Sequence, residues 1–146
     1  MHGAEPLQFA ETVAITARAY AGKLTSEANC GVTEAEHDTD LGENVFVCAG
    51  PSDAALPCAS AQGAMGLFYE GQLGSGKTST YGARAKQVLW KPTTRLGCGL
   101  DTCTKDGLTY SALVCHYSPP MNPGIVATEA DLEPKTRSSA ACGYDD

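Results

Sequence analysis

The chain has 146 residues, 7 cysteines and a formal net charge of −7 at pH 7. This length favours one domain that can bury a hydrophobic core without help from a metal ion. The negative charge argues against nucleic acid and anionic lipid surfaces as general partners, and no apolar run is long enough for a membrane span.

The first predicted element is an amphipathic helix over residues 7–24. Its apolar positions recur at helical spacing, at Ala10, Val13, Ala17, Tyr20, Ala21 and Leu24. Pro6 stands directly before this segment, and proline is common in the first turn of a helix because its missing N–H needs no partner there. We therefore expect the helix to begin next to Pro6.

The middle of the chain alternates between polar and apolar segments. Residues 25–41 are polar and predict a loop, whereas the short apolar run at residues 44–48 is ambiguous. Small and apolar side chains at helical spacing predict a second helix over residues 59–70, weakened by two glycines. The glycine-rich residues 71–82 predict a second loop.

Three strands are predicted in the second half, at residues 86–91, 95–99 and 109–117. The last two would form a hairpin with a cysteine in each arm. From Pro119 onward we expect irregular structure, with one short helix capped at residues 128–131. Helices followed by antiparallel strands joined by short turns predict an α+β layered domain.

The seven cysteines exceed ordinary cytosolic usage and lack the C-x-x-C spacing of a zinc site. This pattern favours an oxidising, extracellular compartment. Residues 1–5 have neither the basic start nor the apolar run of a signal peptide, so we expect the secretion signal to lie outside this sequence.

The positions of the cysteines suggest three disulfides, although sequence alone does not fix their connectivity. The hypothesis pairs the two hairpin arms, the two ends of a short loop, and the first half of the chain with the hairpin: Cys98–Cys115, Cys48–Cys58 and Cys30–Cys103. Cys142 is left over. It is then a free thiol, a link to another subunit, or the partner of a cysteine outside this sequence.

Several short motifs stand in a fixed order along the chain. They are Pro6-Leu7-Gln8-Phe9 with Arg18-Ala19-Tyr20-Ala21, then Cys30, His37, Gly42-Glu43-Asn44, residues 87–90 and residues 113–122. This ordered set resembles the CAP superfamily of cysteine-rich secretory proteins, antigen 5 and plant pathogenesis-related class 1 proteins. A single motif of this kind arises by chance, but the ordered set is specific.

The resemblance implies a secreted, disulfide-bonded α-β-α sandwich with an antiparallel central sheet over residues 1–122, followed by an irregular tail at residues 123–146. It also implies a central cleft lined by two histidines and two glutamates. His37 and Glu43 match two of these positions, and Glu70 matches a third with a shift of one residue. The family motif GHFTQ corresponds to residues 83–87 of this chain. Arg84 stands in place of the motif's histidine, which is the second histidine of the cleft, and Gln87 is the last residue of the motif.

The replacement by Arg84 changes the chemistry that the cleft can support. A guanidinium group carries a permanent positive charge and has no lone pair for a metal, so it would repel a bound cation. We therefore expect little zinc affinity, no cofactor, and an ion pair of Arg84 with Glu43 or Glu70.

The family's first helix, with its HNxxR motif, has no counterpart here, because the sequence starts after it. We expect one layer of helix to be missing: either the sequence is truncated, the tail after Pro123 fills the place, or another subunit covers it. An uncovered apolar face favours association. Together with Cys142, this motivates the hypothesis of a self-assembling subunit of an extracellular structure.

Two other interpretations are weighed, nucleotide binding and hydrolysis. Residues 71–78 fit the phosphate-loop pattern G-x-x-x-x-G-K-[ST], but the aspartate that a magnesium site needs after a second strand is not found, so a flexible connection is preferred. His37, Glu43 and Glu70 could also serve a hydrolase, yet no nucleophile is marked out beside them. A hydrogen-bonded polar cluster is the preferred interpretation.

We therefore predict a protein that acts by binding a small lipid, a sterol or a protein partner, and not an enzyme. The alternatives are the self-assembling structural subunit and the cleft hydrolase. Trp90 and Tyr117 are expected in the core, because alternate residues of a strand turn inward. His116 is expected to be a strand residue with an exposed face.

Overall fold

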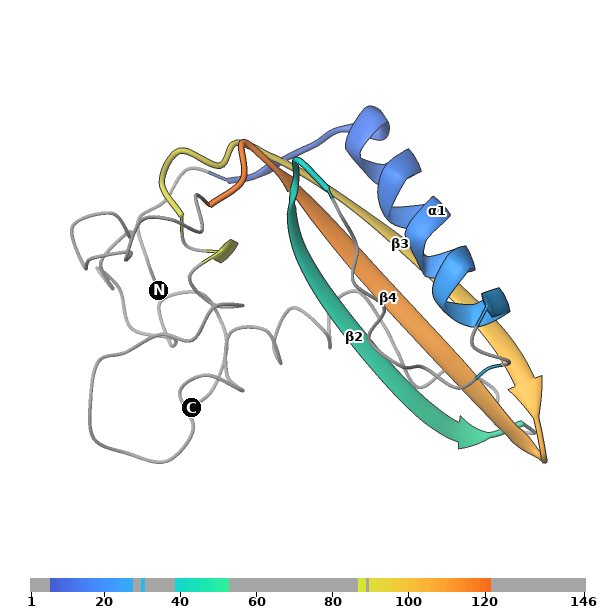
Figure 1. Ribbon diagram of the computed structural model, residues 1–146. Helices are drawn as coiled ribbons and strands as arrows, with labels where there is room; N and C mark the ends of the chain where they lie inside the picture. The colour runs from blue at the N-terminus through green and yellow to red at the C-terminus, as the bar shows by residue number, and fades with distance from the viewer. Residues whose placement is uncertain (1–5, 28–29, 31–38, 53–86, 89, 122–146) are drawn as a thin grey trace, which may run out of the picture.

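The computed structural model of the protein describes residues 6–27, 30, 39–52, 87–88 and 90–121. Within them it contains one long helix and a four-stranded sheet (Figure 1). The elements in chain order are β1 (Gln8–Phe9), α1 (Glu11–Glu27), β2 (Gly42–Pro51), β3 (Arg95–Lys105) and β4 (Leu108–Ser118). No helix of this part of the chain is long and apolar enough to cross a membrane.

The predicted first helix is confirmed, but its predicted start beside Pro6 is wrong. The backbone before it forms β1, whose Gln8 N–H donates to Thr94 O at 2.9 Å. The first helical hydrogen bond instead runs from Ala14 N to Ala10 O at 2.9 Å. Because the segment after Pro6 pairs with a strand, helix α1 begins at Glu11, and it continues to Glu27 through the first residues of the predicted loop.

The sheet has the strand order β1-β3-β4-β2. Its three long strands are antiparallel, as expected, whereas β1 is parallel to β3, a pairing that the sequence did not indicate. The predicted hairpin is confirmed as β3 and β4, joined at Asp106 and Gly107, which have φ angles of 52° and 76°. Two successive residues with positive φ match the right-handed twist of a hairpin.

One ambiguous segment and one other strand prediction have different outcomes. The ambiguous run at residues 44–48 lies inside β2. The strand predicted at residues 86–91 is wrong for its described part, because Gln87 and Val88 are helical and Trp90 forms a single bridge. Local bonds explain this, since Trp90 N–H donates to Gln87 O at 3.4 Å. The elements predicted at residues 59–70, 71–82 and 128–131 lie outside the described residues.

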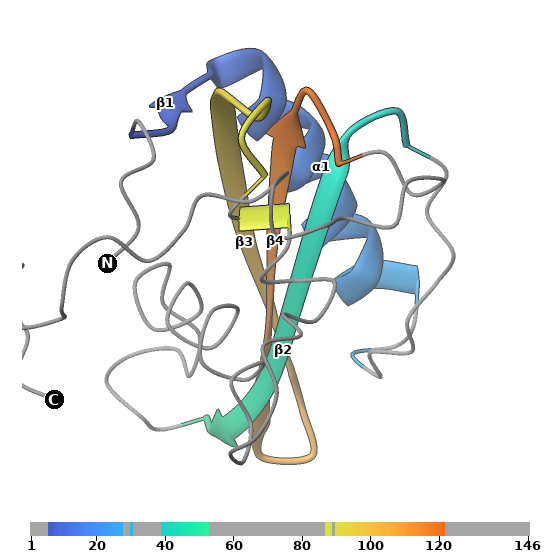
Figure 2. The ribbon, with the colours of Figure 1, turned by 90° about the vertical axis from the view of Figure 1, so that its left-hand side faces the viewer.

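Helix α1 packs along one face of the sheet (Figures 1 and 2). The contact is close because β3 presents glycines to the helix backbone. A Cβ on Gly97 would lie 2.2 Å from the backbone nitrogen of Ala14, and one on Gly99 would lie 2.4 Å from the Cα of Arg18. The core between them consists of Ala17, Tyr20, Ala21, Leu24, Ala112 and Val114.

The opposite face of the sheet carries a second apolar cluster. Its buried members are Leu113, Cys115 and Tyr117, so the prediction of a core Tyr117 is confirmed. Trp90 is also buried, as predicted. The cluster is completed by partly buried side chains, namely Leu7, Phe46, Cys48, Val88, Leu96 and Cys98.

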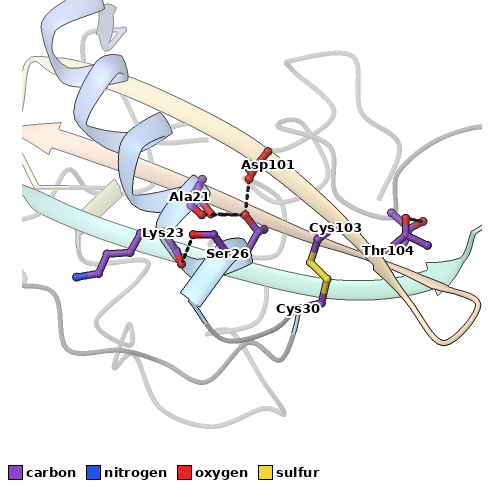
Figure 3. Close-up of a disulfide and its surroundings, with 10 residues drawn as sticks. Ala21, Lys23, Ser26, Cys30, Asp101, Cys103 and Thr104 are labelled. Atoms are coloured by element: carbon purple, nitrogen blue, oxygen red, sulfur yellow. Dashed lines mark hydrogen bonds between the residues drawn. A yellow bond between two sulfur atoms is a disulfide. The ribbon is translucent and has the colours of Figure 1, made fainter.

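Two of the predicted disulfides are present in the described residues. Cys98 and Cys115 face each other in register on β3 and β4, with a Cα–Cα distance of 4.1 Å. Cys30, shortly after α1, is bonded to Cys103 of β3 (Figure 3). Cys48 is also in a disulfide, but its predicted partner Cys58 and the unassigned Cys142 lie outside the described residues.

The end of α1 is fixed to β3 by a second contact close to the Cys30–Cys103 bridge. The Thr25 hydroxyl donates a hydrogen bond to a carboxylate oxygen of Asp101, which is labelled in Figure 3. Helix and hairpin are therefore joined covalently and by hydrogen bonds at the same end. The described part of the fold is α+β.

Candidate functional site

Of the five predicted cleft residues, the structure describes Glu43 and Gln87. His37, Glu70 and Arg84 lie outside the described residues. The expected ion pair of Arg84 therefore stays a prediction. Glu43 contacts His116 of β4, whereas Gln87 contacts Thr93 and the segment after β4.

Glu43 is held by a histidine that the cleft prediction did not include. His116 lies directly opposite Glu43 in the register of β4 and β2, and its Nε2 is 2.9 Å from Glu43 Oε2. The other ring nitrogen, Nδ1, is 2.7 Å from the hydroxyl of Thr16 on α1. A chain of polar side chains, Thr16–His116–Glu43, thus crosses from the helix to the outer strand β2.

The prediction that His116 has an exposed face is wrong, because its exposed fraction is 0%. The residue sits on β4, which has β3 on one side and β2 on the other. Strand alternation places it with Ala112 and Val114 on the face that α1 covers. That alternation is the sequence signal that would have placed His116 inside.

The hydrogen bonds of Thr16 constrain the protons in this chain. Its hydroxyl lies 2.8 Å from Val13 O as well as near His116 Nδ1, and it has one proton to donate. If that proton goes to Val13 O, Nδ1 must carry a hydrogen, and a ring that also donates from Nε2 to the Glu43 carboxylate is then an imidazolium. If the proton goes to Nδ1, the ring is neutral. The donor and acceptor roles of His116 Nδ1 and the Thr16 hydroxyl therefore depend on the tautomer of the ring.

A second buried pair lies on the opposite side of the sheet. Asn44 Nδ2 donates to the phenol oxygen of Tyr117 at 3.1 Å. Burial raises the pKa of Tyr117 far above its ordinary value, while the hydrogen bond from Asn44 acts in the opposite direction. Desolvation dominates because it disfavours the charged phenolate, so Tyr117 is neutral in the folded protein.

Gln87 is 4% exposed and joins three segments through its amide group. Its Oε1 accepts from Met121 N at 2.9 Å, and its Nε2 donates to Thr93 Oγ1 at 3.1 Å. The Thr93 hydroxyl in turn donates to Pro119 O at 2.7 Å. A Cβ on Gly42 would lie 2.2 Å from Gln87 Oε1, so the glycine at this position makes room for the amide.

The polar side chains of this region form hydrogen bonds with other groups of the protein. Both ring nitrogens of His116 and both ends of the Gln87 amide have protein partners. Within the described residues, no group of three His, Cys, Asp or Glu side chains could hold a metal ion. In the part of the chain that the structure describes, the buried hydroxyl of Ser111 on β4 has no hydrogen-bond partner.

Comparison with known proteins gives a family match over most of the chain. Residues 1–117 match the sequence model of the Cysteine-rich secretory protein family, CAP. A curated relative, the Probable pathogenesis-related protein CaO19.6200 of Candida albicans, is 29% identical over 141 residues. The match covers 94% of this chain but 38% of that protein, so the chain spans well under half of the relative's length.

Solved structures show the same fold. The structure of BmVAL-1 has a TM-score of 0.56 at 20% identity, covering 80% of this chain and 60% of that one. The structure of MpPR-1i has a TM-score of 0.54 at 17% identity, covering 84% of this chain and 78% of that one. At these identities the likeness concerns the fold alone, and it supports an α+β sandwich with a mostly antiparallel central sheet.

Proposed function

Because the chain belongs to the Cysteine-rich secretory protein (CAP) family, we propose that it is an extracellular domain that binds a small lipid or sterol and acts without catalysis. The disulfides support the extracellular assignment, since such bonds persist in oxidising compartments. The family alone does not name a ligand. The choice of ligand class rests on one face of the sheet.

The observation that carries the proposal is the half-buried apolar cluster on the face away from α1. Buried Leu113 and Tyr117 are surrounded there by hydrophobic side chains that retain part of their exposure. Leu100 of β3 extends this surface and is 42% exposed. Covering such side chains with an apolar molecule gains about 25 cal/mol per Å² of area removed from water.

The polar network supports binding over catalysis. A general base needs a free lone pair within reach of a substrate proton. His116 is fully buried and engaged at both nitrogens, and Gln87 is engaged at both ends of its amide. We interpret these residues as groups that hold the strands and the following segment in place around the apolar face.

Equilibrium binding of tritiated cholesterol, with unlabelled palmitic acid as competitor, tests the proposal. The variant Leu100→Glu places a charge on the apolar face and should weaken binding at least tenfold. Ile15→Glu is the matched control, because Ile15 is also exposed, at 54%, but lies on α1. Equal binding by both variants, or no binding of either lipid by the unmodified protein, would contradict the proposal.

A second candidate function, self-association, is favoured by Phe9. This residue of β1 is 68% exposed, which is unusual for a large aromatic side chain. It stands where the family motif PLxW has its tryptophan. Light scattering under non-reducing conditions tests this alternative, with Phe9→Ser expected to reduce any oligomer and Cys142→Ser to separate covalent from non-covalent association.

A further inference from the structure

Thr16 is the exposed end of the polar chain that crosses from α1 to β2. The residue is exposed on the helix, whereas the ring of His116 is fully buried. Thr16 Oγ1 lies 2.7 Å from His116 Nδ1, and His116 Nε2 lies 2.9 Å from Glu43 Oε2. A hydroxyl, an imidazole and a carboxylate in this order are the three groups that activate a nucleophilic oxygen.

Helix and sheet together set this order. Thr16 stands about one helical turn from Val13 and Tyr20, which are buried, so it lies at the border of the buried face of α1. His116 is in register with Gly97 of β3 on one side and with Glu43 of β2 on the other. Gly97 contributes no side chain, so the carboxylate beside the ring comes from β2.

The carboxylate determines which ring nitrogen can accept a proton. An ionised Glu43 only accepts hydrogen bonds, so Nε2 carries the ring hydrogen in the neutral imidazole. Nδ1 then presents its lone pair to Thr16, whose hydroxyl donates to it instead of to Val13 O. In this tautomer His116 can remove the Thr16 proton, and the negative charge of Glu43 stabilises the imidazolium that forms.

We propose that Thr16 is a covalent modification site whose hydroxyl reacts with an activated carboxylic ester. The Thr16 oxygen attacks the carbonyl carbon of the ester while its proton passes to His116 Nδ1. A bond forms between this oxygen and the acyl carbon, and the bond from that carbon to the leaving oxygen breaks. The leaving alcohol takes the proton from Nδ1. The product is a threonine ester on α1.

The burial of His116 makes this product stable. Hydrolysis of the ester would require a base that accepts a proton from the attacking water molecule. The ring is 0% exposed and its Nδ1 faces Thr16, so water does not reach the lone pair. The reaction therefore ends after one acyl transfer. This inference goes beyond the proposed function, since it adds a covalent reaction without a catalytic cycle and does not depend on lipid binding.

Incubation of the full chain with p-nitrophenyl acetate, followed by peptide mass spectrometry, tests the proposal. Thr12→Val is the matched control, because Thr12 is exposed one turn earlier on α1. Thr16→Val removes the hydroxyl and Thr16→Ser keeps it, and circular dichroism checks the fold of each variant. The same incubation in urea separates α1 from the sheet and measures the background reaction.

The acetyl group should be found on Thr16, at a rate about a hundredfold above that of Thr12, the lower value for general base assistance. Thr12→Val and Thr16→Ser should keep the reaction, whereas Thr16→Val and unfolding in urea should abolish it. Glu43→Gln should lower the rate by about tenfold or more, because it keeps an acceptor for Nε2 but removes the charge. Nitrogen NMR should show hydrogen on Nε2 of His116 and none on Nδ1.

The opposite results would overturn the proposal. Equal acetylation of Thr12 and Thr16, acetylation of amines alone, or hydrogen on Nδ1 rejects the site and leaves lipid binding untouched. A reaction at Thr16 that persists in urea rejects activation by His116. Continuous release of p-nitrophenolate that requires Thr16 indicates hydrolysis, which rejects the stable ester and contradicts the assignment of a protein without catalysis.

Discussion

His116 and Glu43 face each other in register across β4 and β2, with Nε2 of the imidazole 2.9 Å from Oε2 of the carboxylate. The pair is shielded, since the side chain of His116 is 0% exposed and that of Glu43 is 21% exposed. The sequence resemblance points to Glu43 as a cleft carboxylate. The structure shows that one of its oxygens already has a histidine partner from within the sheet.

The pair should show measurable coupling in a double-mutant cycle. We expect His116→Leu and Glu43→Gln each to destabilise the protein by about 1–3 kcal/mol, because each leaves a polar partner without its hydrogen bond. The coupling energy should exceed about 1 kcal/mol. Urea unfolding of the two single variants and the double variant measures it.

The exposed pair Lys23–Glu27 on α1 supplies the control for this cycle. Its side chains are 48% and 65% exposed, and its atoms lie 3.8 Å apart. Solvent screening limits such a pair to about 0.3–0.5 kcal/mol. A coupling in the buried pair no larger than that of Lys23–Glu27 would show that the His116–Glu43 contact contributes little.

Gly97→Ala should disrupt the contact between α1 and β3. The added Cβ would lie 2.2 Å from a backbone nitrogen, which cannot move aside as a flexible side chain does. We expect a loss of about 3 kcal/mol or more in the free energy of unfolding, comparable to severe overpacking. Thermal and urea unfolding measure the change.

Gly22→Ala, within α1 itself, is the matched control for Gly97→Ala. Its Cβ would meet its nearest atom, Asp101 Oδ2, at 3.8 Å, an ordinary contact. Alanine is favoured over glycine in helices by about 1 kcal/mol, so this variant should be neutral or more stable. If both alanine variants behaved alike, the close approach of helix and strand would be disproved.

Tyr117→Phe should flatten the loss of stability at alkaline pH. Burial raises the pKa of Tyr117 in the folded protein, whereas the unfolded chain titrates near the ordinary value of about 10. Below that pH both states hold the proton. Above it the unfolded chain releases the proton first, so the free energy of unfolding falls by up to about 1.4 kcal/mol per pH unit.

Urea unfolding at pH 8, 10 and 11, with any free thiol alkylated beforehand, tests this prediction. The variant also loses the acceptor of Asn44 Nδ2, so we expect it to be less stable than the unmodified protein at pH 8. The difference between the two proteins should narrow as the pH rises. A constant difference from pH 8 to pH 11 would mean that Tyr117 titrates alike in both states.

Removing the disulfide Cys30–Cys103 by double substitution with serine should cost more stability than removing Cys98–Cys115. The first bridge spans 73 residues and the second spans 17. In the loop-entropy treatment the longer loop contributes about 1 kcal/mol more, with total values of about 3–4.5 kcal/mol. Urea unfolding of the two double variants compares them, and the opposite order would show that burial around Cys115 outweighs chain entropy.

The sequence by itself determined those features that depend on local periodicity and on spacing. Apolar residues at helical intervals located α1, and alternation located the two arms of the hairpin. The cysteine positions suggested the pairs Cys30–Cys103 and Cys98–Cys115, which the structure contains, although spacing alone left their connectivity open. The helix and the hairpin were predictable because neighbouring residues carry their patterns.

The tertiary structure alone decided the features that arise from contacts between distant segments. The segment after Pro6 forms strand β1 because Gln8 N–H and Ala10 N–H donate to Thr94 O and Leu96 O, far along the chain. His116 is buried because α1 covers its face of β4, and it contacts Glu43 because β2 lies beside β4 in this register. Ser111 is unpaired for a related reason, since the face it shares with Leu113 is defined by the packing of the whole sheet and carries few polar groups.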